Sequence, residues 1–254
     1  MPRLIFLGTG TSTGVPQIGC TCPVCTSTDR HDKRLRTSAM IVSDNGRRLL
    51  IDCGPDFRQQ MLSISFAPID KVLLTHEHYD HVGGIDDLRP FSFPHAVDVY
   101  ANAQCCANVK ARIPYCFVEK KYLGVAQLHL HVVSKDDVIK WDGMTICPIE
   151  VMHDKLPILG YRMGDLAYIT DMSSISDEEM DKLHGVKTLV INALRLEPHH
   201  SHQTLGEALQ VISRLHPDVA YLVHMSHQIG KHEDVESMLP ARVHLAYDGL
   251  EITF

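Results

Sequence analysis

One stretch of seven residues, THEHYDH (75–81), constrains this chain more than any other. It places three imidazoles and two carboxylates directly after the apolar run KVLL, which is typical of a buried strand. One residue separates His76 from His78, so both imidazoles can meet one cation, and Asp80 and His81 can hold a second. Mixed nitrogen and oxygen ligands suit Zn, Mn, Fe or Ni, and two such metals about 3.5–4 Å apart can activate a bridging water. A polar, solvated loop is the alternative, but such a loop needs no comparable density of ligand-type side chains.

Further ligand-type side chains follow other predicted strands. His153 ends MTICPIEVMH, Asp171 ends LAYITD and His224 follows YLV. Strand ends are where a rigid scaffold presents chemistry. Short strand-like runs alternate with helical ones, and we detect neither a low-complexity linker nor a repeat. The pattern predicts two sheets covered by helices in one layered α/β or α+β domain spanning residues 1–254.

Composition narrows the setting of these residues. The formal net charge of −7 gives no chain-wide attraction to nucleic acid or to anionic lipid. The opening MPRLIFLGTG lacks the features of a signal peptide, and no apolar run approaches the ~20 residues of a membrane span. We therefore expect a cytoplasmic protein with no membrane partner, for which nucleic acid is a disfavoured ligand.

A cysteine cluster predicts a second kind of metal site. Cys20, Cys22 and Cys25 form C-x-C-x-x-C, and three thiolates need a fourth ligand to close a tetrahedral structural zinc site. His227 lies three residues after His224 and is the natural candidate. The alternative is a set of reduced, loosely packed thiols. The remaining cysteines have no such spacing and are expected to be buried free thiols: Cys53, Cys105, Cys106, Cys116 and Cys147.

The ordered set of motifs resembles the metallo-β-lactamase superfamily. The resemblance rests on H-x-H-x-D-H after a strand, on RLLIDCG, and on the later ligands in their order. It implies an αββα sandwich of two mixed sheets flanked by helices. It also implies two active-site metals (Mn, Zn, Ni or Fe), one held by His76, His78, His153 and Asp171, the other by Asp80, His81, Asp171 and His224. Asp52, in RLLIDCG, is implied to brace the metal loop.

Several motifs are similar to those of one branch, the PhnP-type phosphodiesterases: LGTGTSTGVP, C-x-C-x-x-C, THEHYDHVGG, SHQTLGEAL, HMSH and YDGLEI. This resemblance implies hydrolysis of a small cyclic phosphodiester, such as 5-phosphoribosyl 1,2-cyclic phosphate, by a hydroxide bound to two metals. His202 in SHQTLGEAL is the expected general acid, with His199 and His200 as open alternatives, and Asp80 is expected to contribute to catalysis as well as to metal binding.

Two basic residues are candidates for binding a substrate phosphate. Arg89 and Lys155 are the favoured cations for a substrate phosphate because they lie near the ligands in sequence. Asp248 is expected to support a ligand histidine by a hydrogen bond, and the alternative is that it ends a strand in a turn. A homodimer, the commonest closed assembly of soluble proteins, is one possible oligomeric state.

Three alternative functions stay open. They are a tRNA 3′-processing endonuclease, another cyclic-nucleotide phosphodiesterase, and a non-catalytic metal-binding interaction module. Against the first, no long basic insertion is present.

Overall fold

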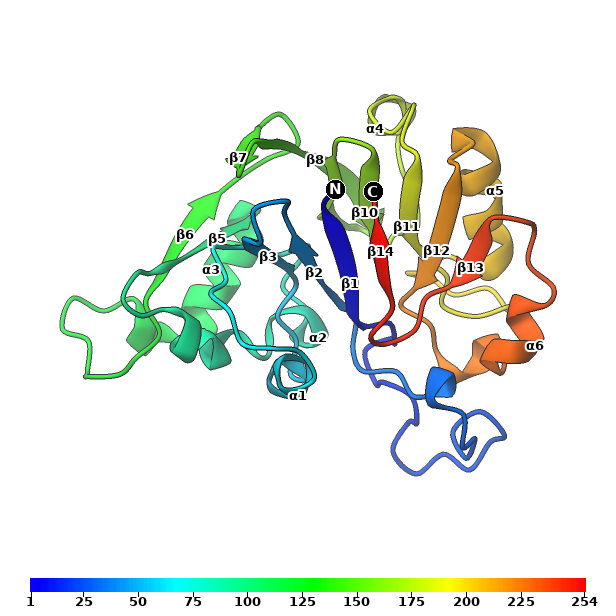
Figure 1. Ribbon diagram of the computed structural model, residues 1–254, viewed down its shortest axis with the longest axis horizontal. Coiled ribbons are helices and arrows are strands. Elements are labelled where there is room, and N and C mark those ends of the chain that lie inside the picture. The colour runs from blue at the N-terminus through cyan, green and yellow to red at the C-terminus, as the bar shows by residue number, and fades with distance from the viewer.

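The computed structural model describes residues 1–254, and two seven-stranded mixed sheets form its centre (Figure 1). The first sheet has the order β14-β1-β2-β3-β4-β5-β6 and the second β13-β12-β11-β10-β9-β8-β7. The strands of the first sheet are β1 Arg3–Gly8, β2 Ser38–Val42, β3 Arg48–Ile51, β4 Lys71–Leu73, β5 Val97–Ala101, β6 Leu128–Val132 and β14 Glu251–Thr253. Those of the second are β7 Ile139–Trp141, β8 Met144–His153, β9 Leu156–Met163, β10 Leu166–Ile169, β11 Thr188–Asn192, β12 Val219–Val223 and β13 Val243–Leu245.

Helices cover the outer face of each sheet. Against the first sheet lie α1 Phe57–Leu62, α2 Tyr79–Val82 and α3 Ala103–Arg112; against the second lie α4 Asp177–Asp181, α5 Leu205–Leu215 and α6 His232–Glu236. Short 3-10 helices are η1 Arg30–Asp32, η2 Ile85–Phe91, η3 Pro114–Cys116 and η4 His227–Ile229. This is the αββα sandwich of two mixed sheets that the family resemblance implies. None of the helices is long and apolar enough to cross a membrane.

Side chains alternate between the two faces of each strand. This alternation produces three buried apolar layers, one between the two sheets and one under the helices of each sheet. In β3, Leu49 and Ile51 point into the core between the sheets, whereas Leu50 packs under the helices of the first sheet. In β10, Tyr168 enters the core between the sheets, whereas Ala167 and Ile169 pack under the helices of the second. Successive side chains of a strand point to opposite faces, so a strand buried on both faces reads as a continuous apolar run.

The register of the parallel strands sets where the polar side chains emerge. In the second sheet Ile169 pairs with Ile191, and Ile191 with Leu222, so β10, β11 and β12 end at one edge. In the first sheet β3, β4 and β5 are parallel and end together in the same way. The segment Ile85–Phe91 is a 3-10 helix, and its Pro90 cannot donate an α-helical hydrogen bond. The assignment of one domain to residues 1–254 stays a prediction.

Candidate metal centre

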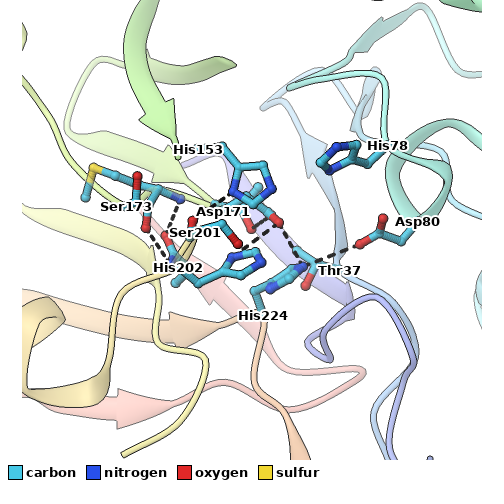
Figure 2. A network of polar contacts seen from close by, with 12 residues as sticks. Thr37, His78, Asp80, His153, Asp171, Ser173, Ser201, His202 and His224 are labelled. Atoms are coloured by element: carbon cyan, nitrogen blue, oxygen red, sulfur yellow. Dashed lines mark hydrogen bonds and ion pairs between the residues drawn. The ribbon is translucent and has the colours of Figure 1, made fainter. Parts of the chain in front are cut away.

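Polar side chains from both sheets converge where these strands end (Figure 2). His78 and Asp80, from the loop and helix after β4, face His153 and Asp171 from the second sheet. Asp52, Asp171 and His224 follow their strands with positive φ angles of 60°, 59° and 56°. A non-glycine residue in this left-handed region is uncommon and strained, and such strain concentrates at functional sites.

The first group of ligand-type atoms comes from His76, His78 and His153, whose ring nitrogens lie within 4.8 Å of one another. The Nε2 atom of His76 lies 3.0 Å from Nδ1 of His78. His153 is the last residue of β8, and its Nδ1–H donates to the carbonyl oxygen of Ser201 at 2.8 Å. That hydrogen bond fixes the tautomer of His153 and leaves Nε2 free for a cation.

The second group contains Asp80, His81, Asp171 and His224, all buried. The Nε2 atom of His224 lies 3.0 Å from Oδ1 of Asp171 and 3.5 Å from Oδ2 of Asp80. Burial alone would lower the pKa of His224, but Asp171 and Asp80 raise it to about 9. Burial likewise opposes the charge on Asp171, but His224 and His81 hold its pKa well below the usual range. This pocket therefore favours a cation beside its two carboxylates.

The donor set fits a divalent metal better than it fits hydrogen bonding. The Nε2 atom of His81 lies 3.2 Å from Oδ2 of Asp80 and 3.2 Å from Oδ2 of Asp171, yet it is buried without a hydrogen-bond partner. The three atoms are thus close together but not aligned as donor and acceptors. A cation between them would satisfy all three, and mixed imidazole and carboxylate ligation suits Zn, Mn, Fe or Ni.

Asp52 lies behind the second group. Its Oδ2 accepts a 2.7 Å hydrogen bond from His81 Nδ1, and its Oδ1 accepts one of 2.8 Å from the backbone N–H of Thr75. Burial raises the pKa of Asp52, whereas His81 and Thr75 lower it. Gly54 completes this contact, because a Cβ atom there would lie 2.0 Å from the carbonyl oxygen of Asp80. The Asp-x-Gly sequence thus supplies an acceptor and lets the ligand loop pack closely.

His202 lies beside the shared carboxylate. Its Nδ1 is 3.7 Å from Oδ1 of Asp171, is buried and has no hydrogen-bond partner. Burial lowers the pKa of His202 to about 3. His202 also forms a possible ligand group with His153 and Asp171, which the sequence did not suggest. Of the two alternatives, His199 is partly buried and contacts Ser201, and His200 is exposed.

Cys20, Cys22 and Cys25 lie on the loop between β1 and β2, and their sulfur atoms lie within 4.8 Å of one another and of a ring nitrogen of His227, the first residue of η4. The Nδ1 atom of His227 is 3.2 Å from Sγ of Cys22 and 3.4 Å from Sγ of Cys20. The hydrogen bond to His227 lowers the pKa of Cys22 to about 6, and burial raises the pKa of Cys25 to about 11. The four donors match a Cys₃His zinc set. All eight cysteines are free thiols.

The favoured substrate cations lie in different places. Arg89 donates to Asp86 at 2.5 Å and lines an apolar groove with Phe57 and Phe91. Lys155 lines a pocket with His78 and His153.

The expected hydrogen bond from Asp248 to a ligand histidine is wrong. Asp248 accepts instead from the backbone and hydroxyl of Thr9 and from the backbone of Leu35. The reason is its position, after β13 on the loop that faces the N-terminal segment. Its effect on the centre is indirect, since the carbonyl of Thr9 accepts from the backbone N–H of Met225, beside His224.

Sequence reasoning missed three supporting side chains. The hydroxyl of Thr75 contacts Asp52 at 2.9 Å. The amide of Asn192 pairs with both backbone groups of Met172 at 2.8 and 2.9 Å and holds the residue after Asp171. The hydroxyl of Tyr161 donates to the carbonyl of Leu74 at 2.6 Å. Thr75 and Asn192 could have been found, because each is a polar residue at the end of an apolar strand.

Comparison with known proteins agrees with this geometry. A family model described as the beta-lactamase superfamily domain matches residues 47–225. A solved structure described as a new diphosphatase from the PhnP family is 41% identical, with a TM-score of 0.93, over 100% of this chain and 98% of that one. The chain belongs to the PhnP family of the beta-lactamase superfamily. The predicted resemblance is thereby confirmed.

Two further relatives of this PhnP-family chain bear on function. A Porphyromonas gingivalis protein named octanoyltransferase is 46% identical over 250 residues, which are 98% of this chain and 51% of that protein. The chain thus spans about half the length of this curated relative. The short form of human tRNase Z is 16% identical, with a TM-score of 0.72, over 99% of this chain and 98% of that one. At that identity the likeness shows the fold alone.

Proposed function

We propose that this chain is a metal-dependent phosphodiesterase that hydrolyses a small cyclic phosphodiester such as 5-phosphoribosyl 1,2-cyclic phosphate. The observation that carries the proposal is the pair of ligand groups at the strand ends, one centred on His76, His78 and His153 and the other on Asp80, His81, Asp171 and His224. Asp171 contacts both sides, because it also groups with His153. The eight free thiols support the expected cytoplasmic setting.

The chain's own residues hold and orient the reacting groups. Two divalent metals, when bound, would lower the pKa of water and offset the charge of the phosphoryl oxygens. Asp52 keeps the proton of His81 on Nδ1, so that Nε2 faces the centre. The choice of Zn, Mn, Ni or Fe for this centre, and a structural Zn at the cysteine cluster, belong to the same proposal.

His202 is proposed to assist the leaving group. With a pKa lowered to about 3, it is neutral in the free protein at pH 7 and still donates one N–H. A phosphate anion beside it would raise this pKa, because an opposite charge favours the protonated form. His202 would then give its proton to the leaving sugar oxygen, a contribution of typically 10²–10⁴-fold in rate.

A diphosphatase is the second candidate. It is favoured by the solved PhnP-family structure of that description, which covers this whole chain at 41% identity. Breaking a phosphoanhydride would use the same metal-ligand groups as breaking a phosphodiester. The two candidate functions are therefore distinguished by which substrate the protein hydrolyses.

We do not assign acyl transfer to this chain. The relative named for it extends well beyond the matched half, so its name does not decide the activity of the part that this chain matches. The tRNA-processing candidate has support from the fold only, and a metal-binding interaction module would leave the buried, unpartnered Nδ1 of His202 beside Asp171 without a role.

A ³¹P NMR time course tests the proposal. The Mn- or Zn-loaded protein would be offered 5-phosphoribosyl 1,2-cyclic phosphate, a 2′,3′-cyclic nucleotide, inorganic diphosphate and a short 3′-extended tRNA. We expect rapid, chelator-sensitive opening of the first. Hydrolysis of diphosphate alone would select the second candidate, and cleavage of the cyclic nucleotide or tRNA alone would select those alternatives. No hydrolysis of any of the four would reject a phosphoesterase.

A further inference from the structure

An apolar groove opens on the helical side of the first sheet, between α1 and the 3-10 helix η2 (Figure 1). Its volume is about 480 Å³, and its apolar lining residues are Phe57, Met61, Leu62, Ile64, Phe66 and Phe91. Two of them are largely open to water, because Leu62 is 70% exposed and Phe66 is 68% exposed. Neighbouring large apolar side chains that stay exposed together mark a surface that binds something.

Three aromatic rings connect this groove to the core of the protein. Phe57 is buried and meets Phe91 edge to face, with ring centres 5.7 Å apart. Phe91 in turn stacks on the exposed Phe66, with ring centres 5.1 Å apart. Aromatic side chains and methionine are enriched in the buried centre of protein interfaces. Covering the groove would therefore extend the existing core outward by one layer.

The walls of the groove are held by the two metal-binding motifs. The helix α1 begins five residues after Asp52, and η2 begins four residues after His81. The backbone N–H of Gly84 donates to the carbonyl of Cys53 at 2.9 Å, and a Cβ atom at Gly84 would lie 2.1 Å from the carbonyl oxygen of Gly54. The two segments are thus joined closely before anything binds, and a surface formed in advance loses little conformational freedom on association.

The charged side chains of the groove are of both signs. Arg89 is paired with Asp86 at 2.5 Å, so these two charges offset each other. Arg58 and Asp87 also line the groove, are exposed, and make no side-chain hydrogen bond or ion pair. An occupant that is only anionic or only cationic would leave one of these two charges without a partner. A surface that presents the same cation and the same anion across a two-fold axis can pair both.

We propose that this groove is the interface of a homodimer, in which a second copy of the chain covers it. In a two-fold symmetric interface the contact of residue i with residue j occurs twice. Arg58 of one protomer then pairs with Asp87 of its partner on both sides of the axis, while Leu62 and Phe66 pack between the two chains. The proposal does not depend on which phosphoester the protein hydrolyses.

Sedimentation of the metal-loaded protein over about 0.1–100 µM tests the interface, and we expect a dimer at the upper concentrations. Arg58→Glu and Asp87→Arg should each weaken the dimer at least about tenfold, because two like-charge contacts replace two ion pairs. The double variant restores opposite charges and should recover the wild-type dissociation constant within about threefold. Leu62→Asp should also weaken the dimer at least about tenfold. Met238→Asp is the control, because this side chain is 68% exposed beyond α6, away from the groove, and should have no effect.

Three outcomes would overturn the interface. A wild-type protein that is monomeric at about 100 µM is one; binding of a small apolar dye in the groove of such a monomer would instead assign it to a small-molecule ligand. A dimer that Leu62→Asp and both single charge reversals leave unchanged is the second, because another face must then form it. The third is weakening by both single reversals without recovery in the double variant, when all three variants keep the thermal midpoint of the wild type.

Discussion

Replacing the buried carboxylate of Asp52 by the amide of asparagine tests how the centre is held. In the wild type, Oδ2 accepts from His81 Nδ1–H at 2.7 Å and Oδ1 accepts from the N–H of Thr75 at 2.8 Å. Asparagine keeps the shape but retains one acceptor. If the asparagine oxygen accepts from the backbone N–H of Thr75, its NH₂ group faces the Nδ1–H of His81, so that two hydrogen-bond donors lie against each other.

The conflict is relieved when His81 moves its proton from Nδ1 to Nε2. That nitrogen lies 3.2 Å from the carboxylates of Asp80 and Asp171 and would then be blocked as a ligand. Loss of such a supporting hydrogen bond typically costs 10–100-fold in metal affinity or activity, or about 1.4–2.7 kcal/mol. We expect a loss of this size for one of the two metals of the centre.

A chelator-competition titration of Zn, read together with kcat/KM, measures the effect. Asp181→Asn is the matched control, because this carboxylate is exposed and lies only near His184. Metal affinity and kcat/KM within twofold of the wild type in Asp52→Asn would refute the tautomer argument. A general loss of folding would appear instead as a fall in the thermal midpoint of the metal-free protein.

The remaining predictions concern the proposed general acid His202, the pKa of His224 and the cysteine cluster. His202→Ala should lower kcat by at least about 100-fold with both metals retained, whereas His199→Ala should not; loss of one metal would make His202 a ligand instead. In chelator-treated protein the pKa of His224 is raised from 6.5 to about 9, so its stabilisation is complete below pH 6.5 and lost as the pH rises through 9. The thermal midpoint of the metal-free protein should fall between pH 6.5 and 9, whereas that of the metal-loaded protein should stay constant, because the metal takes the place of the proton. A constant midpoint in the metal-free protein would contradict this prediction. Cys22→Ser should remove one of three zinc equivalents and lower the thermal midpoint while turnover of the folded protein persists; three equivalents in the variant would reject the cluster as a zinc site.

Much of the strand-end pattern could be predicted from local sequence, because burial on both faces of a sheet imposes continuous apolar runs. MTICPIEVMH coincides with β8. Two short edge strands, β7 Ile139–Trp141 and β14 Glu251–Thr253, were missed, because three residues carry too little periodicity. The interaction partner of Asp248 was also missed, because it depends on how the chain's two ends pack against each other.

The sequence by itself determined the types and order of the ligand side chains: THEHYDH after a strand, then His153, Asp171 and His224. The identity of these residues and their spacing can be read directly from the sequence. Only the tertiary structure decided which atoms meet. Parallel pairing brings strand ends far apart in sequence to one edge, and left-handed backbone at Asp171 and His224 turns their side chains inward. Distances between residues of different strands are set by burial of the whole core, so no stretch of the sequence contains them.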